Sequence, residues 1–371
     1  MIRIVAVAGD PGGANALAPV LDHLLRDSRV ELRCHAYRQA ESLWHSRGLD
    51  CHHLGDKYSQ AEIKAALIGS DLLLTGTSCN GVDWEKYFIV EARSQKIPSL
   101  AVLDFWSNYL SRFTLPVDRL CLPDRVAIMD KCAMQEMLEQ GIDPSHLTIT
   151  GQPAFDCLNK TRQQFTSIRR NEIRSQLKAK EDTYLVCFAS QPLTEMYQAM
   201  GMDSRHRLGY DEREVREMLV AELERLASST GKNIILALLP HPREALEIFS
   251  GLRSQIITIS TVEKISAHEL VMASDVVVGM NSVLLVEACY LGCPVLSIQP
   301  NLVPRDALPT NRAGYSLPAY SRGELRTMLE QMLLSDKFLS SHNDKLAELE
   351  LPAGAAQQVV NLIHNMLEIE R

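Results

Sequence analysis

The stretch that decides the fold is Asp275-Val-Val-Val-Gly-Met-Asn-Ser-Val-Leu-Leu-Val-Glu-Ala-Cys-Tyr-Leu-Gly-Cys-Pro-Val-Leu-Ser297. Its first residues form a short apolar run typical of a buried strand, and the pattern predicts a helix from Ser282 to Tyr290. Gly292 ends that helix, and Pro294 opens a second predicted strand. Strand, helix and strand in this order indicate a parallel sheet with helices on its faces.

The same alternation extends over most of the chain in both directions. Predicted strands are Arg3–Ala8, Val30–His35, Asp71–Thr75, Pro98–Leu103, Thr183–Ala189, Asn233–Leu239, Gln255–Ile259, Asp275–Val278 and Pro294–Ile298. Predicted helices are Ala14–Leu25, Trp84–Arg93, Asp211–Ala227, Ser282–Tyr290 and Glu324–Leu334, with a cation-rich connecting helix in Phe155–Lys180 and a docking helix in Pro352–Glu370. Two doubly wound α/β domains in tandem are the simplest interpretation.

Composition narrows the class of protein. The chain has 371 residues, 46% of them hydrophobic, and a net charge of −8, which disfavours a general nucleic-acid binder. No apolar run is long enough to cross a bilayer and no signal peptide is evident, so we expect a cytoplasmic protein. The nine cysteines are scattered and indicate free thiols, and no motif predicts a metal site.

A glycine-rich turn, Gly9-Asp-Pro-Gly-Gly-Ala-Asn15, joins the first predicted strand to its helix. Backbone N–H groups and the positive end of that helix then face the carboxyl edge of the sheet, which favours an anion or a sugar near Gly12, Gly13 and Asn15. The spacing is not that of a dinucleotide-binding fingerprint. A tight turn that uses glycine only for backbone freedom explains the same residues equally well.

Two residues of the opening stretch point to a ligand. Ser282 stands at the N-cap position, where its hydroxyl and the free N–H groups of the helix suit a pyrophosphate. Glu287 lies five residues later among apolar neighbours, and a buried carboxylate requires a partner, for which the hydroxyls of a ribose are suitable. The alternative for Glu287 is an ordinary ion pair or a solvated side chain.

Several motifs in chain order resemble one superfamily. Gly279-x-Asn281-Ser282-x4-Glu287-Ala288-x3-Gly292-x-Pro294 is similar to the donor-binding segment of GT-B glycosyltransferases and of the non-hydrolysing UDP-N-acetylglucosamine 2-epimerases that share their fold. Thr150-Gly-Gln-Pro-x-Phe-Asp156, Phe188-Ala-Ser-Gln-Pro192 and Leu239-Pro-His-Pro-Arg243 are similar to further motifs of that superfamily. The resemblance covers roughly residues 1 to 340.

This resemblance implies roles for residues of the second domain. The helix that begins at Ser282 would take the diphosphate, Glu287 the ribose, and His241 a phosphate or a catalytic step. The substrate-binding residues implied or suggested here are Ser190, Gln191, Arg243, Gly279, Asn281, Ser282 and Glu287. For Gln191 a simple loop hydrogen bond is an equally good interpretation.

Asp104 is the candidate catalytic base in the first domain. It ends the strand Pro98–Leu103, and ligands in doubly wound folds bind at the carboxyl ends of strands. If Asp104–Phe113 is helical, Asp104, Ser107, Asn108, Ser111 and Arg112 share a polar face, which makes Asn108 and Arg112 candidates for acceptor binding. The alternative is a purely structural N-cap aspartate.

One departure from the superfamily separates two reactions. The epimerases use a carboxylate just after the strand equivalent to Asp71–Thr75, whereas this chain has no acid there until Asp83. We therefore expect glycosyl transfer rather than 2-epimerisation. The chain also lacks the D-Y-S-S string of teichoic-acid glycerophosphotransferases.

The sequence as a whole predicts a metal-independent GT-B glycosyltransferase. Its expected domains are residues 1–160 for the acceptor, 161–351 for the nucleotide sugar, and a helix in 352–371 that packs on the first domain. The substrates would be a nucleotide sugar, in first place a UDP-sugar, and a sugar or lipid-linked acceptor, with no separate cofactor. A 2-epimerase-like enzyme and a catalytically silent nucleotide-sugar-binding protein remain alternatives, and peripheral membrane contact and a homodimer remain open.

Overall fold

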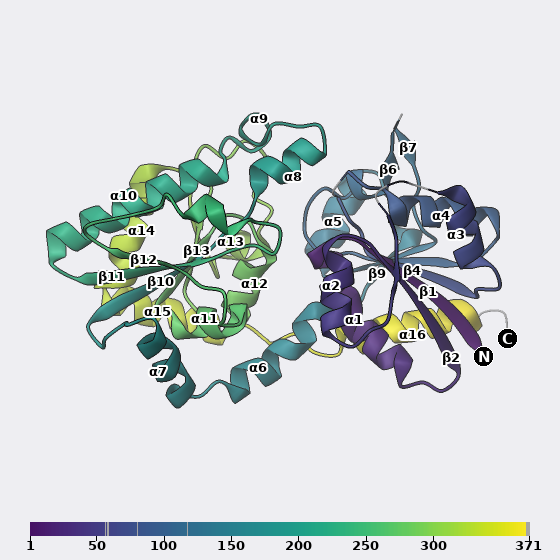
Figure 1. Cartoon of the computed structure of the whole chain (residues 1–371), viewed down its shortest axis with the longest axis horizontal. Helices are drawn as coiled ribbons and strands as arrows, with labels where there is room; N and C mark the ends of the chain where they lie inside the picture. Colours follow the sequence, from purple (N-terminus) through teal and green to yellow (C-terminus); the bar gives the residue numbers. More distant parts are fainter. Residues whose placement is uncertain (56, 58, 80, 117, 369–371) are drawn as a thin grey trace. The chain divides into compact units, whose positions relative to one another are not determined.

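The computed structural model describes residues 1–55, 57, 59–79, 81–116 and 118–368, and the chain divides into two compact units. Unit 1 comprises Met1–Cys157 with Pro352–Arg371, and unit 2 comprises Leu158–Leu351. The first break falls three residues before the boundary expected at 160/161. Both units are doubly wound α/β structures (Figure 1). In the described part of the chain, no helix is long and apolar enough to cross a membrane.

Unit 1 contains a seven-stranded sheet in the order β3-β2-β1-β4-β5-β8-β9, and all of its pairings are parallel. Its strands are β1 (Ile2–Ala8), β2 (Val30–Ala36), β3 (His52–His53), β4 (Leu72–Thr75), β5 (Ser99–Val102), β8 (Arg125–Ile128) and β9 (Leu147–Ile149). Its helices are α1 (Pro11–Leu25), α2 (Gln39–Ser46), α3 (Gln60–Leu67), α4 (Trp84–Ser94), α5 (Lys131–Glu139) and α16 (Ala355–Glu368). Short elements are η1 (Ser111–Phe113), β6 (Thr114–Leu115), β7 (Arg119–Leu120), η2 (Pro144–His146) and η3 (Pro153–Cys157).

Unit 2 contains a six-stranded sheet in the order β12-β11-β10-β13-β14-β15, again parallel throughout. Its strands are β10 (Thr183–Ala189), β11 (Asn233–Leu239), β12 (Thr258–Thr261), β13 (Val276–Gly279), β14 (Val295–Ile298) and β15 (Leu317–Ala319). The helices are α6 (Leu158–Gln164), α7 (Ser167–Gln176), α8 (Leu193–Ala199), α9 (Ser204–Leu208), α10 (Glu212–Thr230), α11 (Ala267–Ala273), α12 (Val283–Tyr290), α13 (Pro309–Ala313), α14 (Arg322–Leu334) and α15 (Asp336–Ala347), with the turn η4 (Leu246–Phe249).

The strand order reverses at an equivalent place in each sheet. β1 pairs with β2 on one side and β4 on the other, and β10 pairs with β11 and β13 in the same way. At such a switch point the loops after neighbouring strands diverge, and ligands of doubly wound folds bind there. We therefore expect binding and catalytic residues at two sets of strand ends. In unit 1 these are the carboxyl ends of β1, β4 and β5, and in unit 2 those of β10, β11 and β13.

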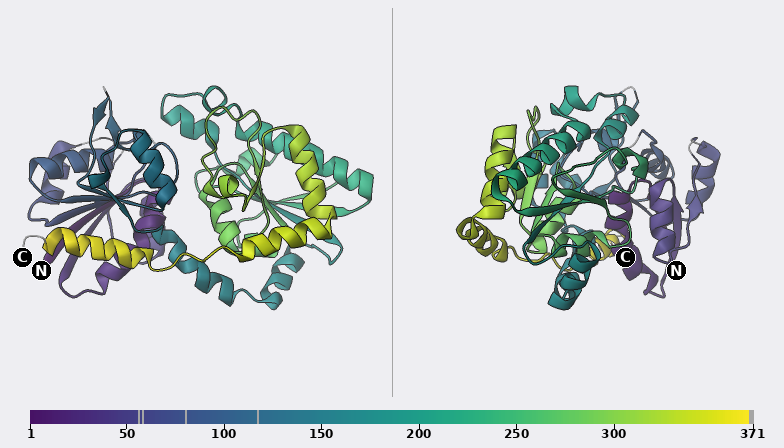
Figure 2. Two further views of the ribbon diagram at one scale, coloured as in Figure 1. Left: turned by 180° about the vertical axis from the view of Figure 1, so that it is seen from behind. Right: turned by 60° about the vertical axis from the view of Figure 1, so that its left-hand side comes forward.

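The last helix of the chain belongs to the core of unit 1. Figures 1 and 2 show α16 beside α1, and Ala356, Val359, Val360 and Ile363 are buried in the same apolar cluster as the residues of α1. Both carboxylate oxygens of Asp156 accept hydrogen bonds from the start of α16, from the N–H of Ala355 at 2.9 Å and of Ala356 at 2.8 Å. The final residues of the predicted helix, 369 and 370, lie outside the described residues.

The helix considered for Asp104–Phe113 is absent, and the prediction of a single connecting helix in Phe155–Lys180 is wrong. Asp104–Phe113 forms an irregular loop that ends in η1, and Asn108 has a left-handed backbone with φ of 58°, which a helix does not permit. The indole of Trp106 and the hydroxyl of Tyr109 donate instead to Asp130 and Glu136. The connecting segment is two helices, α6 and α7, because Thr166 caps a new helix through the N–H of Arg169.

One strand prediction is displaced. β12 covers Thr258–Thr261 instead of Gln255–Ile259, because the hydroxyl of Ser254 accepts from the N–H groups of Ile256 and Ile257 and holds the chain in a turn.

Candidate functional site

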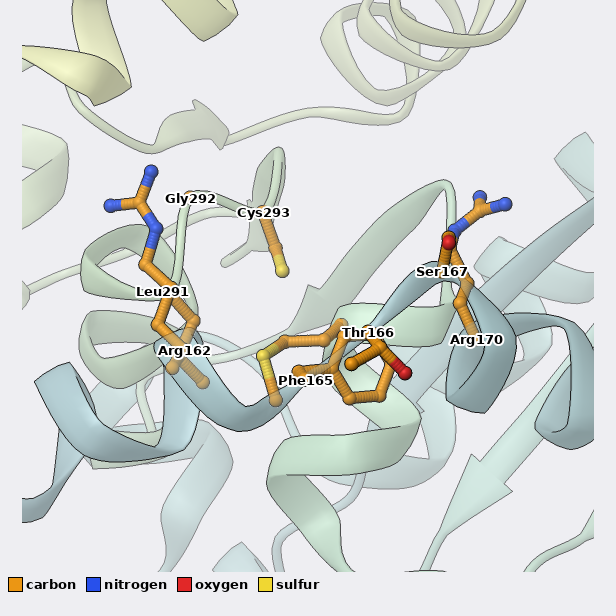
Figure 3. A pocket seen from close by; sticks show the side chains of 9 residues that line it. Arg162, Phe165, Thr166, Ser167, Arg170, Leu291, Gly292 and Cys293 are labelled. Carbon is orange, nitrogen blue, oxygen red and sulfur yellow. The ribbon is translucent and has the colours of Figure 1, made fainter.

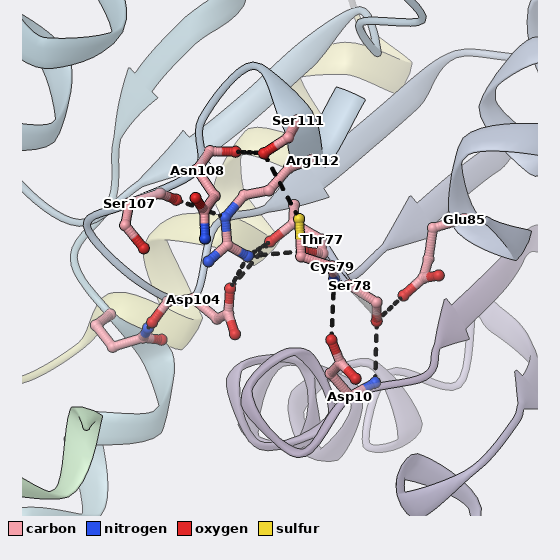
Figure 4. Close-up of polar contacts among 11 residues, drawn as sticks. Asp10, Thr77, Ser78, Cys79, Glu85, Asp104, Ser107, Asn108, Ser111 and Arg112 are labelled. Carbon is pink, nitrogen blue, oxygen red and sulfur yellow. Dashed lines mark hydrogen bonds and ion pairs between the residues drawn. The ribbon is translucent and has the colours of Figure 1, made fainter. Parts of the chain in front are cut away.

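Asp104 follows β5 at the switch-point edge of unit 1 and forms an ion pair with Arg112 (Figure 4). Oδ1 of Asp104 lies 2.5 Å from Nη1 of Arg112 and accepts the hydroxyl of Thr77 at 3.1 Å. Within the described residues, Oδ2 accepts no hydrogen bond, and the side chain is 14% exposed. Oδ1 is thus fixed by protein donors, while Oδ2 has no donor among the described residues and lies against Gly12.

Arg112 is a buried structural cation as well as the partner of Asp104. Its Nη1 also donates to the carbonyl of Thr77 at 2.7 Å, and its Nε donates to the carbonyl of Ser107 at 2.9 Å. Asn108 contributes its carbonyl, which accepts from the N–H of Arg112 at 3.0 Å. The polar residues of the loop therefore lie together as expected (Figure 4), although the loop and not a helix face brings them there.

The glycine-rich turn contacts this carboxylate. α1 begins at Pro11, so Gly12 and Gly13 are in its first turn, and a Cβ atom at Gly12 would collide with Oδ2 of Asp104. Gly13 lies against Gly76, where a Cβ atom would be 3.3 Å from the Cα atom of Gly76. Asn15 is one turn further on and accepts from Arg47 at 3.3 Å. Gly12 and Gly13 therefore lie beside the Asp104 loop, and Asn15 bonds elsewhere.

Sequence reasoning missed a carboxyl group behind this edge, that of Glu85. Glu85 is 3% exposed, and its Oε1 accepts the hydroxyl of Ser78 at 2.5 Å. Burial raises its pKa to about 7. The signal was present in α4, because Glu85 shares the helical spacing of the buried residues Phe88, Ile89 and Ala92.

In unit 2 the turn from β13 to α12 has an open helix N-terminus. Ser282 is the N-cap residue, but its hydroxyl makes no capping bond, and its Oγ is buried with no partner among the described residues. The N–H of Asn281 donates to Oε1 of Gln191 at 3.0 Å. Gly279 fits closely, since a Cβ atom there would lie 3.1 Å from the carbonyl of Ala189. The turn thus presents a buried hydroxyl and a helix N-terminus to the carboxyl edge.

Glu244 holds the loop after β11, which carries His241. This residue was not predicted from the sequence. Its Oε2 accepts the N–H of His241 at 2.8 Å, and its Oε1 accepts the hydroxyl of Ser190 at 2.7 Å. Burial raises the pKa of Glu244. The N–H of Arg243 donates to Nδ1 of His241 at 3.2 Å, which fixes the imidazole ring. Ser190 and His241, from the ends of β10 and β11, are thereby tied together.

Glu287 has a protein partner that the sequence did not predict. Its Oε2 lies 2.9 Å from Nε2 of His268 on α11, and its side chain is 13% exposed. Burial of the ring would lower the pKa of His268, but the hydrogen bond and the charge of Glu287 outweigh it and raise that pKa. The structure therefore shows Glu287 in an ion pair with His268, which was the alternative interpretation. Binding of a ribose by Glu287 stays a prediction.

A pocket of about 310 Å³ lies beside Leu291, Gly292 and Cys293, just after the C-terminal end of α12 (Figure 3). Its lining residues are Arg162, Phe165, Thr166, Ser167, Arg170, Met272, Leu291, Gly292 and Cys293. Arg170 is already paired with Asp275 at 2.9 Å. The predicted site residues of unit 2 other than Glu287 lie at or just after the carboxyl ends of β10, β11 and β13, and Glu287 lies within α12 beside α11. Within the described residues, no group of three or more His, Cys, Asp or Glu side chains is arranged to hold a metal ion.

The chain belongs to a family described as a protein of unknown function, DUF354, whose profile matches residues 96–307. No curated protein matches it in sequence. Among solved structures it is similar to a putative UDP-N-acetylglucosamine 2-epimerase from Listeria monocytogenes, with a TM-score of 0.69 and 17% identity over 99% of this chain and 96% of that one.

Two further solved structures of similar fold are complexes with ligands. The UDP-GlcNAc 2-epimerase of Neisseria meningitidis bound to UDP-GlcNAc has a TM-score of 0.68 and 15% identity over 98% of this chain and 100% of that one. HepE from Anabaena in complex with UDP and glucose has a TM-score of 0.66 and 13% identity over 98% and 100%. At these identities the likeness establishes the fold, and the predicted GT-B fold class is confirmed.

Proposed function

We propose that the chain is a glycosyltransferase that moves a sugar from a nucleotide sugar, in first place a UDP-sugar, to a hydroxyl acceptor. The observation that carries the proposal is the N-terminus of α12, where the buried hydroxyl of Ser282 has no partner among the described residues. A diphosphate supplies the acceptor oxygens that this hydroxyl and the helix N–H groups require. The UDP and UDP-sugar in the structures of similar fold support the choice of nucleotide.

The donor would be held by unit 2. Asn281 and Ser282 would bind the diphosphate, and Gly279 would allow its close approach. The hydroxyls of the ribose would replace His268 as the hydrogen-bond partners of Glu287. His241 and Arg243 would place positive charge at the leaving group, with Ser190 and Gln191 supporting that loop. Glu244, which bonds His241 and Ser190, positions the loop and does not itself contact substrate in this proposal.

The acceptor would be held by unit 1, near Gly12, Gly13, Asn15, Asn108 and Arg112. The acceptor hydroxyl transfers its proton to Oδ2 of Asp104 as its oxygen forms a bond to the anomeric carbon. The bond from that carbon to the diphosphate oxygen breaks, and the nucleoside diphosphate leaves with the electron pair. The fixed Oδ1 keeps the free oxygen in one orientation.

A 2-epimerase is the second candidate, because structures described as UDP-GlcNAc 2-epimerases share the fold. Epimerisation removes and returns the proton on C2, so incubation of UDP-N-acetylglucosamine in heavy water without acceptor would place deuterium there. We expect no deuterium at C2. Its appearance together with the manno epimer would replace the transferase by an epimerase.

The test of nucleotide binding compares UDP, CDP, GDP and ADP by thermal shift, with UDP giving the largest rise in Tm. Asp104→Asn should retain that shift and lower turnover by roughly 100-fold, the usual order for a lost general base. Near wild-type turnover would make Asp104 structural. No shift with any nucleotide would refute the donor assignment, and UDP binding without turnover of any donor and acceptor would indicate a silent binding protein.

A further inference from the structure

Glu85 is a buried acid whose hydrogen-bond partners are neutral groups. Oε1 accepts the hydroxyl of Ser78 at 2.5 Å, and Oε2 contacts the hydroxyl of Tyr37. Among the described residues no Lys, Arg or His forms an ion pair with it. The adjacent Lys86 is directed elsewhere, to Asp83 at 2.8 Å and to the carbonyl of Thr114 at 2.9 Å. A buried carboxylate without a cation is unfavourable, and such a group takes up a proton instead.

The contacts of Tyr37 are compatible with a neutral Glu85. The hydroxyl of Tyr37 lies 3.0 Å from the carbonyl of Val82 as well as against Glu85, but it has a single proton to donate. If that proton goes to Val82, the contact between Tyr37 and Glu85 requires a proton on Glu85. The protonated acid then donates to Tyr37 and accepts from Ser78, so each hydroxyl both donates and accepts.

The acid is connected to the glycine-rich turn through Ser78. The Oγ of Ser78, which donates to Glu85, accepts the N–H of Asp10 at 2.9 Å, and Oδ2 of Asp10 accepts the N–H of Cys79 at 3.0 Å (Figure 4). Asp10 is the residue before α1. Both its backbone and its carboxylate are therefore tied to the loop after β4, and the orientation of Ser78 that permits this is set by Glu85.

We propose that Glu85, in its neutral acid form, is the positioning residue that locks the Asp10 turn onto the loop after β4, and that loss of its proton releases this lock. The titratable groups that act on it are Tyr37 beyond β2 and Asp10 before α1. Ionisation would place a second negative charge near the carboxylate of Asp10 and would reverse the bond between Glu85 and Tyr37, because a carboxylate can only accept. The role of the turn in acceptor binding rests on the proposed function, but the lock itself does not.

The first test needs no ligand. Carbon-13 NMR of glutamate-labelled protein, with the signal assigned by Glu85→Gln, should show the Glu85 carboxyl still protonated at pH 6 and titrating near pH 7. Hydrogen exchange at the N–H of Asp10 should lose roughly tenfold in protection above that transition, the size of one lost hydrogen bond. A Glu85 signal that is fully ionised at pH 6 would overturn the proposal.

The variant Glu85→Gln separates positioning from packing, because its amide reproduces both bonds of the neutral acid but cannot ionise. It should fold, keep the protection at Asp10 and abolish its pH dependence. The matched control is Glu136→Gln, which changes a second buried glutamate in contact with a tyrosine, here accepting from Tyr109 at 2.6 Å, and should leave the Asp10 transition in place. An unchanged transition in Glu85→Gln would refute the assignment to Glu85.

The second test connects the lock to activity. If the transferase proposal holds, turnover should fall above the Glu85 transition in the wild type and remain level there in Glu85→Gln. A titrating Glu85 with no turnover would count against the proposed function alone. Turnover whose pH profile is the same in wild type and Glu85→Gln would refute a positioning role in catalysis.

Discussion

Asp104 and Gly12 fit together only because Gly12 has no side chain: a Cβ atom at Gly12 would lie 1.9 Å from Oδ2 of Asp104. The position of the carboxylate is therefore defined from two sides. Arg112 and Thr77 hold Oδ1, and the first turn of α1 limits where Oδ2 can lie. The glycine-rich turn thus shapes the site by its lack of bulk.

Gly12→Ala should displace the Asp104 carboxylate and destabilise unit 1 by about 1–3 kcal/mol, the usual cost of overpacking. This cost should be smaller when Asp104→Ala is already present, because the colliding oxygen is gone. Urea unfolding of the two single variants and the double variant measures the coupling. Gly55→Ala, where a Cβ atom meets nothing within 4 Å, is the control. Additive effects would mean that the two residues do not collide.

Ser282→Ala should leave the free energy of unfolding almost unchanged, because its hydroxyl makes no bond within the described protein. Ser321→Ala should cost about 1 kcal/mol, since the hydroxyl of Ser321 caps α14 through the N–H of Glu324 at 3.2 Å. UDP binding should respond in the opposite order, weakened in Ser282→Ala and retained in Ser321→Ala. A stability loss at Ser282 equal to that at Ser321 would assign Ser282 a structural role.

Glu287→Gln should lower the pKa of His268, because burial then acts on the ring without a compensating carboxylate. The raised pKa means that the pair stabilises the fold below pH 6.5 and that this contribution is lost as pH rises through the folded pKa. The stability difference between wild type and Glu287→Gln should therefore shrink with rising pH. NMR titration of the imidazole measures the pKa directly.

The control for this titration is Glu269→Gln. Glu269 lies beside His268 on α11, but its carboxylate pairs with Arg169 at 2.7 Å. Its removal should leave the titration of His268 nearly unchanged. Equal shifts in the two variants would show that net charge near the ring, and not the bond to Glu287, sets the pKa.

Asp156→Ala should loosen α16, because it removes the acceptors for the N–H groups of Ala355 and Ala356. We expect a loss of about 1–2 kcal/mol in the stability of unit 1 and faster proteolysis near residue 352. Asp143→Ala removes a comparable capping bond, to the N–H of Ser145 at 2.8 Å in η2, without touching α16. Equal proteolysis of both variants would exclude a specific role for Asp156.

The central strands could be predicted closely from the sequence. Thr183–Ala189 and Asn233–Leu239 have the predicted bounds, because a strand buried on both faces is a continuous apolar run. Asp104–Phe113 has helical spacing but is a loop, since the side chains of Trp106, Tyr109 and Arg112 bond to residues distant in sequence, Asp130, Glu136 and Thr77. Spacing along the chain carries no information about those partners.

The candidate site was predicted less completely than the fold. Residues at strand ends, such as Asp104, His241 and Ser282, could be found because the architecture dictates where loops converge. Glu85 and Glu244 were missed, because each contacts a loop residue at the carboxyl edge of its sheet, Ser78 or His241, and itself lies further from the strand end in sequence. His268 is 19 residues from Glu287 in sequence, and only the packing of α11 beside α12 makes them partners.

The return of α16 to unit 1 determines the order in which the chain can fold during synthesis. Unit 2 is one continuous stretch, Leu158–Leu351, and all of it can leave the ribosome before α16 emerges. The apolar face of α1 that contacts Val359 and Ile363 is made before unit 2 but stays uncovered until α16 has been synthesised. Unit 1 is thus begun before unit 2 and completed after it, so that this apolar face lacks its native cover throughout the synthesis of unit 2.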